Sequence, residues 1–144
     1  VTSGPFDLVL SAFTFDNIPT VERKTHILSS LRELLSAHGA IISVVSSPDI
    51  YLNEWASFST SAFPKNRQAL SGDRVLIEML DVDDRRPVED IVCSDEDYAE
   101  IYRRAGLEVL EKLRPLAHGR EPYDWVSETL VAPWVVYALA PEAD

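Results

Sequence analysis

The chain has 144 residues, and its 24 acidic and 13 basic side chains give a formal net charge of −11. That charge excludes a nucleic-acid-binding surface, because phosphate binding needs clustered Lys and Arg. With 46% hydrophobic and 26% charged residues, the composition excludes a disordered chain and predicts one domain over residues 1–144.

Cysteine content and hydropathy indicate the cellular environment that such a chain suits. Cys93 is the single cysteine, so no intrachain disulfide can form, which is typical of a reducing, cytoplasmic environment. No apolar run reaches the roughly 18 residues that cross a bilayer, so we expect no membrane association.

The first 48 residues predict a strand, a helix and a second strand. Residues 6–13 form a nearly continuous apolar run, typical of a buried strand in a parallel sheet. Thr20 can cap a helix that runs to about His38, with Gly39 as its stop. Residues 40–47 are a second apolar run. A helix between two buried strands predicts a parallel crossover and an α/β fold.

The rest of the chain is less regular but still alternates between helix and strand. Residues 49–72 are interpreted as a short helix and a loop, and Ser94 can cap a helix that ends near Gly106. Extended segments are predicted at 74–80, 88–93, 107–117 and 133–140.

An acidic stretch from Asp73 to Glu100 contains eleven acids and three bases. A solvated face is the favoured interpretation of such a charge run. A metal site is the alternative. No pair of His or Cys supports it and the spacing is not that of a calcium loop, so we expect no metal.

The order of these segments is that of a known family. Residues 5–13 and 14–19 are similar to its fourth strand and the active-site end of that strand. Leu34 to Ile42 is similar to the leucine-rich segment, glycine and fifth strand of that family. Tyr98 to Val109 is similar to the segment that leads into its sixth strand. Trp125 to Leu139 is similar to its closing hairpin and seventh strand. Over nearly its whole length, the chain resembles the second half, strands four to seven, of class I S-adenosyl-L-methionine-dependent methyltransferases.

The resemblance implies a partial Rossmann-like sheet, mostly parallel with an antiparallel last strand and helices on both faces. The family's first half carries the Gly-rich cofactor turn, which is absent here because all five glycines are isolated. We therefore expect a fragment-like C-terminal portion that supplies the acceptor side and part of the cofactor pocket and is inactive alone. A start codon close to Val1 would instead favour a non-catalytic partner or scaffold chain.

The missing first half has a physical consequence for residues 6–13. This strand is central in the family, so here it becomes an open apolar edge, and such edges pair with another chain. We expect a homo-oligomer, such as a dimer, or pairing with the missing N-terminal half. The alternative scaffold function would use the same exposed strand.

The resemblance also implies a set of site residues. Ser11, Ala12 and Phe13 are expected to line S-adenosyl-L-methionine, and Asp16 to orient the substrate or accept its proton. Asn17, Tyr51 and Trp55 are expected to contact a small-molecule substrate. Structural interpretations stay open: Asp16 and Asn17 suit a helix-initiating turn, and the aromatic pair suits a core.

Overall fold

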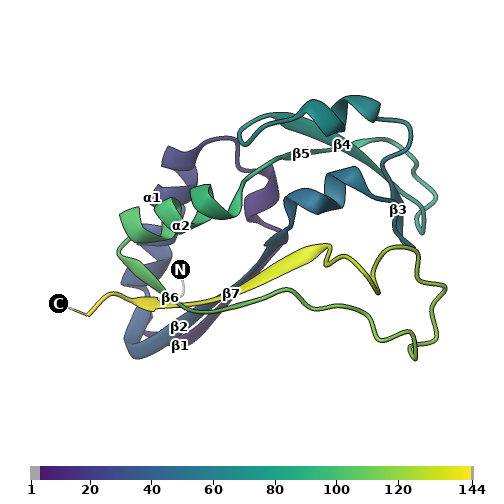
Figure 1. Cartoon of the computed structure of the whole chain (residues 1–144). Coiled ribbons are helices and arrows are strands. Elements are labelled where there is room, and N and C mark those ends of the chain that lie inside the picture. Colours follow the sequence, from purple (N-terminus) through teal and green to yellow (C-terminus); the bar gives the residue numbers. More distant parts are fainter. Residues whose placement is uncertain (1–3, 144) are drawn as a thin grey trace.

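The computed structural model describes residues 4–143, which form two β-sheets and two α-helices (Figure 1). The larger sheet has the strand order β1-β2-β7-β6. Its strands are β1 (Phe6–Ala12), β2 (Leu35–Ser46), β6 (Leu107–Leu113) and β7 (Trp134–Pro141). Strands β1 and β2 are parallel, whereas β7 runs antiparallel to both β2 and β6. The α/β class expected from the sequence is confirmed, with a mixed sheet.

Both helices begin at residues that cap them. The Thr20 hydroxyl accepts a hydrogen bond from the Arg23 N–H at the start of α1 (Val21–Glu33). The Ser94 hydroxyl accepts one from the Asp97 N–H at the start of α2 (Asp95–Arg104). Each bond satisfies an N–H group that has no partner within its helix.

The predicted end of the first helix at His38 is wrong. Helix α1 ends at Glu33, and the next residues already belong to β2, which begins at Leu35. Gly39 does not stop the helix. A Cβ atom at that position would lie 2.7 Å from the Phe6 carbonyl oxygen, so glycine permits β1 and β2 to approach each other.

The main core lies between the larger sheet and the two helices. Alternate residues of the strands, such as Ile41, Val45 and Leu139, point into it and are fully or almost fully buried. From the helices, Leu28 and Ile101 complete the contact, and both are fully buried.

The expected placement of helices on both faces of the sheet is wrong for residues 4–143. Helices α1 and α2 contact each other on one face (Figure 1). On the opposite face of β1, the side chains of Leu8 and Leu10 are 60% and 68% exposed. The reason is local: one crossover helix joins β1 to β2, and α2 packs beside it. The described residues therefore leave an apolar sheet face open.

A second, smaller sheet fills the segment between β2 and α2. Its antiparallel strands are β3 (Phe58–Ser59), β4 (Arg74–Met79) and β5 (Val88–Ile91). The sequence predicts a short helix and a loop over residues 49–72. In the structure, this segment contains two short 3₁₀ helices, η2 (Pro48–Leu52) and η3 (Pro64–Gln68), with β3 between them. A separate core forms beneath this sheet around Trp55, Phe58 and Val75.

Strand β6 ends at Leu113, before the predicted end at Ala117, and a long connection then leads back to β7. In residues 4–143, no helix has the length and apolarity needed to cross a bilayer.

Candidate functional site

A cavity of about 290 Å³ opens where β1 and β2 end, between the larger and the smaller sheet. Its lining combines apolar side chains with two carboxyl groups: Phe13, Asp16, Asn17, Ser46, Ile50, Ser57, Phe58, Ile77, Met79, Val88, Asp90 and Trp134. Ligands of open α/β sheets bind at the carboxyl ends of the strands. The cavity is therefore the candidate site.

Phe13 shapes the entrance to this cavity from the end of β1. Its backbone has a φ of 59°, a left-handed conformation that is uncommon for a bulky residue. Its N–H still donates to the Val44 carbonyl oxygen at 2.9 Å, and its ring lies 5.5 Å from the ring of Trp134. This strained conformation turns the chain away from the sheet next to the cavity, and such residues cluster at functional sites.

Asp16 is held against the end of β2. It belongs to the short helix η1 (Phe15–Asn17) and is only 4% exposed. One carboxylate oxygen accepts the Ser46 N–H at 3.0 Å, and the other accepts the Ser46 hydroxyl at 2.9 Å. Burial raises the pKa of Asp16 above its ordinary value, although the bonds from Ser46 oppose this.

Asp90, on β5, supplies the second carboxyl group and is 7% exposed. Its oxygens accept the Asn17 side-chain amide at 2.7 Å and the Tyr51 hydroxyl at 3.2 Å. Burial, followed by the negative charge of Asp16, raises the pKa of Asp90 to about 6. The two carboxyl groups line the same cavity, and the negative charge of Asp16 acts on Asp90.

The interpretation of residues 73–100 as a wholly solvated face is wrong at Asp90. The tertiary fold turns this one acid inward, opposite Asp16, while Asp83 and Asp84 stay exposed. A local signal existed, because Asp90 directly precedes the apolar residues Ile91, Val92 and Cys93. Reasoning from the sequence missed it as a site residue.

Lys24 is a second residue that reasoning from the sequence missed. Its side chain is 2% exposed, and its ammonium lies 5.0 Å from the ring centroid of Tyr98. Among residues 4–143, its Nζ atom has no hydrogen-bond partner. Its positive charge lowers the pKa of both Asp16 and Asp90, but its side chain does not line the cavity.

The predicted site residues are only partly brought together. Phe13, Asp16 and Asn17 line the cavity, and Tyr51 lies behind its wall, where it holds Asp90. Trp55 does not reach the cavity. Its ring stacks on Phe58 in the smaller core, and its indole N–H donates to the Ile50 carbonyl oxygen at 2.7 Å.

The two other residues expected near the cofactor lie on β1. Ser11 is buried, and in residues 4–143 no group bonds to its hydroxyl. Ala12 is exposed at the end of the strand.

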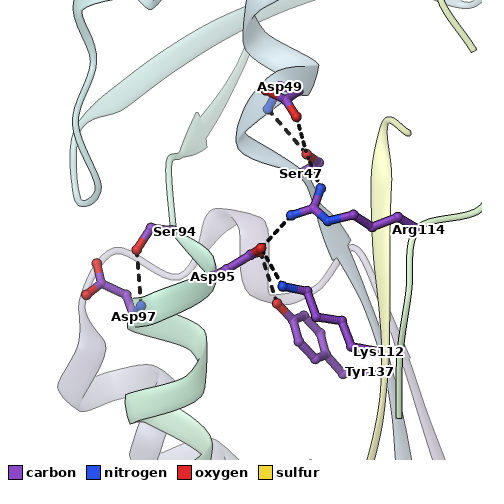
Figure 2. A network of polar contacts seen from close by, with 8 residues as sticks. All are labelled: Ser47, Asp49, Ser94, Asp95, Asp97, Lys112, Arg114 and Tyr137. Atoms are coloured by element: carbon purple, nitrogen blue, oxygen red, sulfur yellow. Dashed lines mark hydrogen bonds and ion pairs between the residues drawn. The ribbon is translucent and has the colours of Figure 1, made fainter. Parts of the chain in front are cut away.

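A polar network fastens the end of β2 to its surroundings (Figure 2). Arg114 donates to the Ser47 hydroxyl at 2.9 Å and also pairs with Asp95 at the start of α2. The Asp95 carboxylate also accepts hydrogen bonds from the Lys112 ammonium and the Tyr137 hydroxyl. The network joins α2, β2, β7 and the end of β6 next to Ser46, so it positions one wall of the cavity.

A smaller cavity of about 200 Å³ shares Ser57, Phe58 and Trp134 with the first. Trp125 and Glu128 are among its other lining residues. For the part of the chain that the structure covers, no group of three or more His, Cys, Asp or Glu side chains could hold a metal ion.

Comparison with known proteins places this fold. No protein-family model and no curated protein matches the sequence. Solved structures do match. The chain is similar to an S-adenosylmethionine-dependent methyltransferase from Clostridium acetobutylicum, with a TM-score of 0.61 and 12% identity over 99% of this chain and 61% of that one.

Two further structures agree. The methyltransferase CcbJ from Streptomyces caelestis gives a TM-score of 0.62 at 15% identity, over 99% of this chain and 60% of that one. The glycopeptide N-methyltransferase MtfA, complexed with S-adenosyl-L-methionine, gives 0.59 at 13% identity, over 99% and 57%. The chain thus spans 57 to 61% of the length of these three proteins. Over that span, it has a class I S-adenosylmethionine-dependent methyltransferase-like fold.

Proposed function

We propose that this chain takes part in S-adenosyl-L-methionine-dependent methyl transfer and holds a small-molecule acceptor in the cavity between its two sheets. One observation carries the proposal: in a methyltransferase-like fold, the cavity opens at the carboxyl ends of β1 and β2 and contains buried carboxyl groups. Methyl transfer needs an acceptor held close and aligned, and a largely apolar cavity can supply that positioning.

The end of β1 fits one wall of a cofactor site. Ala12 is small and exposed, Phe13 turns the chain, and the buried Ser11 hydroxyl has no partner among residues 4–143. When bound, the cofactor supplies an electrophilic methyl group on a sulfonium ion. We propose that Ser11, Ala12 and Phe13 border it, and that a segment outside this chain supplies its remaining contacts.

In this proposal, the chain's own residues receive the acceptor. Apolar walls such as Phe58, Ile77 and Met79 exclude water around it, and Asn17 keeps Asp90 in place. Asp16 orients the acceptor or takes its proton, because its fixed carboxylate lies at the cavity wall.

Calorimetric titration with S-adenosylhomocysteine tests this function on the full-length gene product and on residues 1–144. We expect the full-length product to bind and the 144-residue chain to bind at least about tenfold more weakly, because most contacts of such a cofactor lie in the fold's other half. Failure of the full-length product to bind would contradict the proposal.

A pair of variants tests the cofactor wall. Ala12→Arg places a long cation at the end of β1 and should lower the affinity for S-adenosylhomocysteine by about tenfold or more. Leu70→Arg is the matched control, because Leu70 is 74% exposed and lines none of the cavities described above. Equal affinities for the two variants would remove residues 11–13 from the cofactor site.

A second candidate function is favoured by the open edge of β1. This strand has one neighbour in the sheet, and its Leu8 and Leu10 side chains are exposed. A non-catalytic partner or scaffold chain would pair through residues 6–13, with a second copy or with an N-terminal half. The same titration separates the two functions, since a scaffold has no reason to bind S-adenosylhomocysteine.

A further inference from the structure

The cavity has an unbalanced charge. Of the twelve side chains that line it, the two that can ionise near neutral pH are both acids, Asp16 and Asp90. Lys24 is the basic group that acts on both, but its side chain lies outside the cavity lining and stacks over Tyr98. The open space therefore contains two carboxylates and no lining cation.

Hydrogen bonds hold these carboxylates in place without using all their acceptor sites. Ser46 supplies one donor to each oxygen of Asp16, and Asn17 and Tyr51 supply one to each oxygen of Asp90. Each carboxylate oxygen accepts about two hydrogen bonds, so lone pairs remain for a ligand. An ammonium group, with several N–H donors and a positive charge, matches two fixed acceptors better than a hydroxyl does.

The remainder of the cavity selects the body of the ligand. Phe13, Phe58, Ile77, Met79 and Trp134 are among its walls, and the volume is about 290 Å³. Such walls favour an aromatic or branched aliphatic group, because burying apolar surface is favourable while a second polar group would lose its hydration.

We propose that the acceptor is a small amine with an apolar body, whose nitrogen is recognised by the carboxylates of Asp16 and Asp90. The methylation step in this assignment rests on the proposed function, whereas binding of the amine to the carboxylates does not depend on it. In the step, the acceptor nitrogen gives an N–H proton to the carboxylate pair and forms a bond to the methyl carbon. The bond from that carbon to sulfur breaks, and its electron pair stays on sulfur.

Two probes that differ in one group test the recognition. The full-length protein is titrated by calorimetry with 2-phenylethylamine and with 2-phenylethanol, which have the same apolar body. We expect the amine to bind at least about tenfold more tightly, because a charge-assisted bond to a carboxylate exceeds a neutral one. Equal affinity of the two probes, or no binding of the amine, would overturn the proposal.

Variants assign the preference to the carboxylate pair. Asp90→Asn should weaken amine binding by about tenfold and leave alcohol binding nearly unchanged, since it removes charge but keeps shape. Asp83→Asn is the matched control from the same acidic stretch, because Asp83 is exposed and outside the cavity. An equal loss in both variants would show general surface attraction and contradict the site.

A further variant keeps the test decisive if Asp90→Asn fails to fold. Met79 is half-buried and lines the cavity, so Met79→Lys places a cation there without cutting the hydrogen bonds of Asp90. It should weaken the amine more than the alcohol, and equal weakening of both would count against the proposal.

Titration of the same samples with S-adenosylhomocysteine distinguishes failure of the amine inference from failure of the proposed function. Binding of S-adenosylhomocysteine without amine preference would overturn this inference and leave the proposed function standing. Amine preference without S-adenosylhomocysteine binding would overturn the proposed function and keep the amine site. If Asp90→Asn weakened S-adenosylhomocysteine as much as the amine, the pair would be binding the amino group of the cofactor, which would contradict the acceptor assignment.

Discussion

Single buried charges set how this protein responds to pH. In most native proteins, paired carboxylates have lowered pKa values and acid destabilises the fold. Asp90 behaves in the opposite way, because burial and the nearby charge of Asp16 favour its protonated form. Hydrogen bonds from Tyr51 and Asn17 and the positive charge of Lys24 offset only part of that effect.

The first prediction concerns Asp90→Asn. The stability linked to Asp90 is fully present below its unfolded pKa of 3.8 and is lost as the pH rises through about 6. The asparagine does not ionise, so the variant should gain stability relative to the wild type across that window, by at most about 3 kcal/mol. Urea unfolding at several pH values measures the difference. Asp83→Asn is the control, and a gain of the same size there would contradict the assignment.

A second prediction concerns Lys24→Met. A buried ammonium without a hydrogen-bond partner in the described residues costs free energy, and methionine has a similar shape. At about pH 5 we expect the variant to be more stable by about 1–3 kcal/mol. The gain should shrink towards about pH 8, because Asp90, with its pKa of about 6, is then ionised and the variant lacks the compensating charge of Lys24.

Denaturant unfolding at both pH values checks this prediction. Arg23→Met is the matched control, since Arg23 is the exposed neighbour on α1. A gain that is independent of pH would show that Lys24 does not act on the two carboxyl groups.

At the scale of elements, the start of α2 is the point where the helix is fastened to the larger sheet. The Asp95 carboxylate accepts hydrogen bonds from three side chains (Figure 2). Lys112 lies on β6, Arg114 directly follows β6, and Tyr137 lies on β7. Burial raises the pKa of Asp95, but the hydrogen bonds from Lys112 and Arg114 outweigh it and leave this pKa below its ordinary value. The helix is thus held by charge as well as by its Ser94 cap.

The third prediction is that Asp95→Asn destabilises the fold by about 1–2 kcal/mol near neutral pH, because two ion pairs are lost and Asp95 is partly exposed. The stability that Asp95 contributes is present above its unfolded pKa and is lost as the pH falls through the lower folded value. The loss should therefore shrink in acid. Thermal unfolding measures it, with Glu96→Gln as the exposed control in the same helical turn.

At the scale of the whole molecule, the larger sheet has one covered and one open face. The helices shield one face, while Leu8 and Leu10 on the other are 60% and 68% exposed. Apolar patches of this kind mark surfaces that contact another chain or segment. Strand β1 is also an edge of the sheet, so its backbone can pair as well.

The fourth prediction follows from that surface. Residues 1–144 alone should self-associate, and Leu10→Lys should shift them towards the monomer by about tenfold or more in dissociation constant, because a charge on the open face opposes association. Sedimentation velocity measures the distribution. Leu70→Lys is the control, as that leucine is similarly exposed but lies in the loop before β4. A monomeric wild type at high concentration would contradict the prediction.

The sequence alone determined the features that depend on local pattern. The apolar run of residues 6–13, the Thr20 and Ser94 caps and the last apolar strand each carry their own signal, because periodicity and capping act over a few residues. They are enough to predict the α/β class and the methyltransferase-like order of the elements. They also placed Phe13, Asp16 and Asn17 at the end of a strand, where the cavity described above opens.

Only the tertiary structure decided which distant residues meet. Asn17 and Asp90 are 73 positions apart, and their contact exists because the smaller sheet folds back over the end of β1. The same packing turned Trp55 into the smaller core, ended α1 at Glu33 and left one sheet face open. Each outcome depends on which surface lies opposite a side chain, and local sequence does not contain that information.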